Sequence, residues 1–67
     1  MNIDNVLEVL IKLNFEFRLE HTPDFSRVLV PLNNKDCIGV DIIFDMVGRD
    51  IIDIDFPTLE EWNEIFS

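Results

Sequence analysis

The amino-acid sequence predicts one small acidic α+β domain over residues 1–67: an N-terminal helix, a four-stranded antiparallel sheet made of two β-hairpins, and a short C-terminal helix. Three observations predict this class. Leucines recur at helical spacing near the start, two stretches alternate apolar and polar residues around turns, and a capping pattern precedes the last apolar residues. A hydrophobic content of 48% is too high for a disordered chain, and the length fits a single domain.

The first helix is expected over residues 4–14. Its buried stripe consists of Val6, Leu7, Leu10 and Leu13. Asn2 or Asp4 can cap its N-terminus, because either side chain can accept a hydrogen bond from a backbone N–H of the first turn. Asn14 can adopt the left-handed conformation that ends a helix and reverses the chain.

The first hairpin is predicted from alternation over residues 15–21 and 26–32. Pro23 and the aspartate after it mark the turn, since proline presets the backbone angle of the second turn position. A four-residue loop then sets three cross-strand pairs: Phe17 with Val30, Leu19 with Val28, and Glu20 with Arg27.

The second hairpin is predicted over residues 38–45 and 51–56, where apolar and acidic residues alternate. A three-residue loop after Asp45, with Gly48 in a left-handed position, keeps apolar residues opposite apolar residues. The inner pairs are then Ile42 with Ile52, Val40 with Ile54, and Ile38 with Phe56. The outer pairs are Asp41 with Asp53 and Ile43 with Ile51, and Asp55 lies diagonal to Asp41.

The last helix is predicted from a capping box made by Thr58 and Glu61. Its apolar side contains Leu59, Trp62, and either Ile65 or Phe66. We expect the sheet to curve over the first helix, which leaves the outer face of the second hairpin uncovered.

That outer face is the candidate partner-binding surface. Its residues are Asp41, Ile43, Asp45, Ile51, Asp53 and Asp55. Aspartate is rare in strands, and like charges opposite one another destabilise a sheet, so this pattern conflicts with stability in a way typical of functional sites. An apolar pair, Ile43 and Ile51, ringed by carboxylates has the anatomy of a protein interface. The alternative is that the first helix, or a partner subunit, covers this face too.

The charge balance narrows the class of partner. Fourteen Asp and Glu residues against five Lys and Arg residues give a net charge of −9 at pH 7. A field of that sign repels nucleic acid and anionic membranes, so we expect no direct binding to either. It favours a protein partner with a basic surface. Solubility is the competing explanation, since acidic surfaces keep small domains dispersed.

No residue pattern indicates an enzyme, a metal site or a cofactor site. The segment "DIIDID" lacks the loop spacing and glycine of a calcium-binding hand. His21 has no evident nucleophile partner, and Cys37 is expected to be an inert thiol. A lone cysteine, together with the lack of a basic and apolar leader, predicts a cytoplasmic location.

The hypothesis from these patterns is a non-enzymatic binding protein that inhibits or regulates a basic, nucleic-acid-binding protein. Alternate carboxylates on one strand lie about 6.7 Å apart, a several-ångström spacing like that of phosphates, so they can imitate nucleic acid in a basic groove. Small acidic inhibitors of nucleases, CRISPR effectors and other defence enzymes, including phage-encoded ones, act in this way, and the likeness is in charge and size only. The alternative is a self-associating module, such as a homodimer, or an adaptor that uses the face around Ile43 and Ile51.

Overall fold

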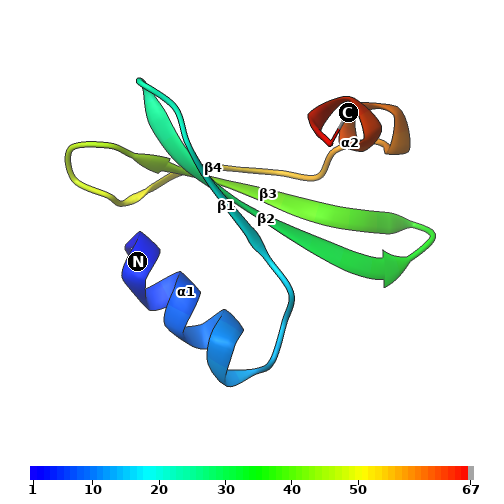
Figure 1. Cartoon of the computed structure of the whole chain (residues 1–67), viewed down its shortest axis with the longest axis horizontal. Helices are drawn as coiled ribbons and strands as arrows, with labels where there is room; N and C mark the ends of the chain where they lie inside the picture. The colour runs from blue at the N-terminus through cyan, green and yellow to red at the C-terminus, as the bar shows by residue number, and fades with distance from the viewer. Residues whose placement is uncertain (67) are drawn as a thin grey trace.

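The computed structural model describes residues 1–66 as two helices and a four-stranded antiparallel sheet (Figure 1). In chain order the elements are α1 (Ile3–Lys12), β1 (Arg18–His21), β2 (Phe25–Asn34), β3 (Cys37–Asp45), β4 (Ile51–Asp55) and α2 (Leu59–Ile65). The strands lie side by side in the order β1-β2-β3-β4. The predicted α+β class is therefore confirmed. Neither helix in this part of the chain is long and apolar enough to cross a membrane.

The ends of α1 are set by local hydrogen bonds. Asn2 is the N-cap and forms a capping box with Asn5, so the helix begins one residue earlier than predicted. At the other end, Asn14 has a φ of 63°, which confirms the left-handed position. The N–H of Asn14 donates to the carbonyl of Ile11, and the N–H of Phe15 donates to the carbonyl of Leu10. This pattern closes the last turn and ends the helix at Lys12, two residues before the predicted end.

The first hairpin has the predicted register. Leu19 pairs with Val28 and Glu20 pairs with Arg27, although β1 begins only at Arg18. The hydroxyl of Thr22 accepts hydrogen bonds from two backbone N–H groups of the turn. Turn chemistry and alternation thus agree, and neither depends on distant contacts.

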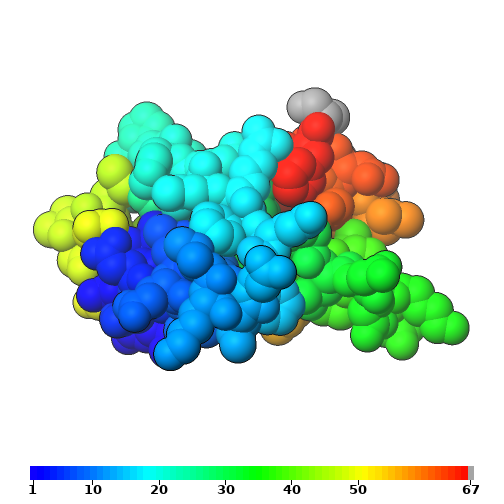
Figure 2. All heavy atoms as spheres, turned by 60° about the horizontal axis from the view of Figure 1, so that its bottom comes forward, coloured from blue at the N-terminus to red at the C-terminus, as the bar shows by residue number. Residues whose placement is uncertain are grey.

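The main core lies between α1 and one face of the sheet. Its buried side chains are Ile3, Val6, Val28, Val30 and Phe44. Because side chains alternate between the two faces of a strand, these residues define the α1 side of β2 and β3. The hairpin tip joining β2 to β3 projects beyond α1, as Figure 2 shows in green beside the blue helix.

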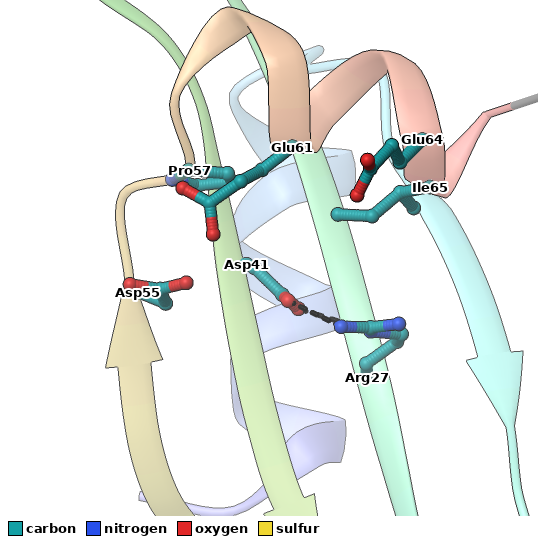
Figure 3. A pocket seen from close by; sticks show the side chains of 7 residues that line it. All are labelled: Arg27, Asp41, Asp55, Pro57, Glu61, Glu64 and Ile65. Atoms are coloured by element: carbon teal, nitrogen blue, oxygen red, sulfur yellow. Dashed lines mark hydrogen bonds and ion pairs between the residues drawn. The ribbon is translucent and has the colours of Figure 1, made fainter.

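The second helix, α2, lies on the opposite face of the sheet, which corrects the expectation that this face is uncovered (Figures 1 and 3). Val40 packs against the core on the α1 side, so its neighbour Gly39 faces the other way, toward Trp62 of α2. The Phe66 ring, 4.8 Å from that of Trp62, lies under the guanidinium of Arg18 at 5.2 Å. A glycine in a central strand thus provides the gap that seats a large aromatic ring.

The second hairpin departs from the predicted register. The observed pairs are Asp41 with Asp55, Ile42 with Ile54, Ile43 with Asp53, and Phe44 with Ile51. The ladder skips Ile52, which is an extra residue in β4 and makes a β-bulge. The predicted pairs are therefore wrong: Ile42 with Ile52, Val40 with Ile54, Ile38 with Phe56, Asp41 with Asp53, and Ile43 with Ile51.

The loop between β3 and β4 explains this difference. The left-handed residue is Arg49, with a φ of 60°, and not Gly48 as predicted. The carboxylate of Asp45 accepts hydrogen bonds from the N–H groups of Val47 and Gly48. The carbonyl of Arg49 accepts from the N–H of Ile3 in α1. A contact with the distant N-terminus thus fixes a longer loop than sequence pattern alone predicts.

We expect Gly39→Ala to loosen α2. A methyl group at this position would overlap the six-membered ring of Trp62, and overpacking of this kind costs about 1–3 kcal/mol. The fluorescence of Trp62, the only tryptophan, reports the change, and urea unfolding measures the free energy. Gly48→Ala is the matched control, because an added methyl there meets mainly the flexible carboxylate of Asp45. Equal behaviour of the two variants would contradict this seating of Trp62.

We expect Arg49→Gly to stabilise the protein. A left-handed conformation strains any residue with a Cβ atom, and relief of the strain exceeds the entropic cost of glycine by about 0.5 kcal/mol. For a domain of this size the melting temperature would rise by about 2–4 °C. The lost ion pair to Asp4 is exposed and contributes little. A fall in melting temperature would show that the Arg49 side chain matters more than its backbone.

Candidate partner-binding surface

The α2-facing side of the sheet carries a grid of charged and apolar residues fixed by strand pairing. One row across the strands is Arg18, Leu29, Asp41 and Asp55, and the next is Glu20, Arg27, Ile43 and Asp53. Leu29 and Asp41, at the centre of the first row, are buried, whereas Asp55 at the edge is exposed. Burial therefore divides the predicted acidic face into a covered centre and an open edge.

The covered centre contains an ion pair between neighbouring strands. Arg27 Nε and Nη2 donate to the two carboxylate oxygens of Asp41, at 3.2 and 2.6 Å. The Asp41 side chain is 3% exposed and that of Arg27 is 23% exposed. A buried carboxylate is tolerated when its charge and its lone pairs are satisfied, and a two-pronged contact with arginine does both. Asp41 is thus a structural residue and is not presented to a partner.

The other predicted surface residues have different positions. Asp45 is half-buried, and its oxygens already accept hydrogen bonds from the loop. Ile43 is half-buried on the α2 side, whereas Ile51 packs against the core on the α1 side. The bulge at Ile52 causes this separation, because one extra residue turns the following side chains to the opposite face. The expected apolar pair of Ile43 and Ile51 is therefore wrong.

Asp53 and Asp55 alone among the six predicted residues are exposed. Asp53 Oδ1 accepts a hydrogen bond of 3.0 Å from the N–H of Ile54, which holds its carboxylate beside the backbone of β4. Asp55 pairs with Asp41 across the ladder, at the open edge of the sheet. The guanidinium of Arg27 is bound to Asp41, so Asp41 is neutralised and Asp55 supplies negative charge at this edge. The presented charge is therefore on β4.

A pocket of about 330 Å³ opens between this face and α2 (Figure 3). Its lining residues are Arg27, Asp41, Asp55, Pro57, Glu61, Glu64 and Ile65. Figure 3 shows the Arg27–Asp41 pair at the bottom, Asp55 at one side, and the two glutamates of α2 above. Four carboxylates against one guanidinium give the pocket a negative potential, which suits a cationic side chain better than an anion.

The negative charge extends beyond the pocket. Residues 50–66 contain six carboxylates and no Lys, Arg or His; the six are Asp50, Asp53, Asp55, Glu60, Glu61 and Glu64. The same segment exposes five large apolar side chains: three from β4 and its end, Ile52 (61% exposed), Ile54 (50%) and Phe56 (64%), and two from the region of α2, Leu59 (63%) and Phe66 (39%). We call residues 50–66 the acidic segment.

Sequence reasoning missed most of this surface. Ile52, Ile54 and Phe56 were expected on the inner face, and the glutamates of α2 were assigned only to helix capping. The run of carboxylates without a basic residue after Arg49 was the available signal. The exposure of the isoleucines had no such signal, because it results from the bulge and from α1 lying under β2 and β3.

Other reactive groups lie apart from this surface. His21 Nδ1 is 2.8 Å from the hydroxyl of Ser26, a partner that sequence reasoning did not find. Ser26 is buried, and its hydroxyl donates to the sulfur of Met46. The Ser26 hydroxyl thus lies between the Met46 sulfur and the histidine ring, whose role as donor or acceptor depends on its tautomer. Within residues 1–66, no three His, Cys, Asp or Glu side chains are grouped so as to bind a metal ion.

A scan against protein-family models and searches of curated proteins and solved structures found no match to this chain. The class defined by the fold is an acidic α+β protein with one helix on each face of an antiparallel meander. The candidate site is the acidic segment with its pocket.

We expect Asp41→Asn to lower the free energy of unfolding by about 3 kcal/mol, because the mostly buried charge of Arg27 loses its partner. Replacing both partners, with Arg27→Met and Asp41→Leu, should restore most of that loss, since an apolar pair of similar size leaves no unpaired charge. Asp53→Asn, at an exposed carboxylate, is the control and should be nearly neutral. Urea unfolding measures all three. A neutral Asp41→Asn variant would contradict the structural role.

Proposed function

We propose that this protein is a non-enzymatic binding protein whose acidic segment binds the basic surface of another protein and so inhibits or regulates it. The observation that carries the proposal is the combination, within residues 50–66, of six carboxylates, no basic residue and five exposed large apolar side chains. Carboxylates steer the approach of a basic partner, and apolar groups released from water stabilise the complex once formed.

The partner class follows from the sign and spacing of the charges. Asp53 and Asp55 project from the same side of β4, and alternate residues of a strand lie about 6.7 Å apart. The pocket carboxylates of α2 continue this charge beside the strand. Basic grooves that bind phosphates offer complementary charges at comparable spacing, which favours a nucleic-acid-binding protein as the target and imitation of nucleic acid as the mechanism.

A second candidate is an adaptor that binds a protein without imitating nucleic acid. The exposed Ile52, Ile54 and Phe56 favour it, since large apolar side chains gathered on one segment mark interaction surfaces. The two candidates differ in their response to salt. Charge-led binding weakens as salt screens exposed charges, with a Debye length of about 8 Å at physiological ionic strength, whereas apolar binding changes little.

Charge reversal at β4 tests the proposal. A variant with Asp53→Lys and Asp55→Lys should associate with the target at least about tenfold more slowly, because exposed charges mainly set the rate of encounter. The matched control, Asp24→Lys with Asp36→Lys, has the same net charge and alters exposed turn residues outside the acidic segment. The target is isolated by affinity capture and identified, and association is followed with the purified pair by surface plasmon resonance.

Three outcomes support imitation of nucleic acid: the β4 variant alone loses association rate, salt weakens binding, and added DNA or RNA competes with the protein. A captured partner without a basic groove, bound equally well at all salt concentrations and by both variants, would contradict the proposal. The adaptor function would then be the better account.

A further inference from the structure

The outer edge of β4 is partly occupied by the N-terminus of the chain. Asn2 forms an antiparallel bridge with Asp50, and the N–H of Ile51 donates to the carbonyl of Met1 at 3.3 Å. The carbonyl of Asp50 accepts from Asp45 of β3, so the N–H of Ile51, in the same planar peptide, points away from the sheet. The edge of β4 is therefore already paired with an antiparallel backbone segment at Asp50 and Ile51.

From Ile52 to Asp55, no strand within residues 1–66 continues that pairing, because β4 is the last strand of the sheet. The N–H of Ile54 donates instead to Asp53 Oδ1 at 3.0 Å, a local bond that an added strand would replace. Ile52 and Ile54 stay largely exposed, and Ile54 shares the face of its partner Ile42, which packs on the core. Asp53 and Asp55 project from the other face. The side chains of an added strand would thus alternate: apolar ones beside Ile52 and Ile54, and basic ones beside Asp53 and Asp55.

A second copy of this chain is a poor occupant. Full antiparallel overlap of two β4 strands sets Asp53 opposite Asp53 of the other copy, and a shift by two residues sets Asp53 opposite Asp55. Like charges directly opposite one another destabilise a sheet. Each copy also carries a net charge of −9. Charged residues on a short edge strand are a known defence against pairing between identical sheets.

We infer that the edge of β4 binds an extended segment of a partner protein in which apolar residues alternate with lysine or arginine, added as a fifth strand. The basic residues lie opposite Asp53 and Asp55, and the apolar residues extend the surface of Ile52 and Ile54. Main-chain hydrogen bonds supply the affinity and the alternating side chains supply the specificity. This inference rests on the proposed function, because it names the form in which the basic partner is bound.

The test uses the full-length protein and a short synthetic peptide of alternating valine and lysine. Two further peptides have the same sequence but carry N-methyl groups on all valines or on all lysines. In a strand, alternate residues direct their N–H groups to opposite edges, so one of these peptides retains the edge that pairs with β4 and the other loses it. Charge and composition are the same in both, which isolates backbone pairing from electrostatic attraction.

We expect one N-methylated peptide to bind like the parent and the other to bind at least about tenfold more weakly, by fluorescence anisotropy. The amide resonances of residues 52–55 should shift on binding of the parent. A peptide of the same composition with valines and lysines in separate blocks should bind weakly. Asp24→Lys with Asp36→Lys again serves as the control variant.

Equal binding of the two N-methylated peptides would overturn strand addition. If salt weakens that binding, and the variant Asp53→Lys with Asp55→Lys weakens it too, then the acidic segment still binds basic residues, but without adding a strand. No binding of any peptide would also overturn the inference, while the association experiment with the captured target would still decide the proposed function. A homodimer in sedimentation, with residues 52–55 protected from hydrogen exchange in the absence of peptide, would identify a second copy as the occupant and overturn it.

Discussion

The ion pair between Arg27 and Asp41 is the interaction on which the α2-facing side of the sheet depends. Asp41 lies beneath α2, where an unpaired carboxylate would be costly, and Arg27 of the adjoining strand satisfies both of its oxygens. The pair lets a short helix cover a charged face. The pair also engages Arg27, the one basic residue that lines the neighbouring pocket. Asp55 and the glutamates of α2 therefore give this pocket its negative potential.

The bulge at Ile52 is the second constraint, and it decides which side chains the acidic hairpin presents. It turns Ile51 into the core and leaves Ile52 at the open edge. Apolar and acidic side chains then alternate along a stretch of β4 that has no neighbouring strand on its outer edge within residues 1–66. A strand of that kind repels a copy of itself and is complementary to a basic one.

Of the six residues predicted for the acidic face, Asp53 and Asp55 are exposed in the structure. The sequence predicted exposed charge at the middle of the sheet, whereas the exposed carboxylates lie at the β4 edge and on the adjoining helix. The reason is that a strand pattern reports alternation but not coverage. Asp41 and Asp53 have the same pattern, but Asp41 is in a central strand, beside Arg27 and beneath α2, whereas Asp53 is in the edge strand.

The sequence by itself determined the features that short-range interactions control: both helix caps, the left-handed Asn14 and the register of the first hairpin. Each requires contacts only a few residues apart in the chain, so local chemistry is sufficient. The tertiary structure alone decided the face on which α2 lies, the left-handed conformation of Arg49 and the burial of Asp41. These depend on the seat that Gly39 provides, on the bond from Ile3 to the loop and on the reach of Arg27 across the strands, and no periodicity encodes such distant contacts.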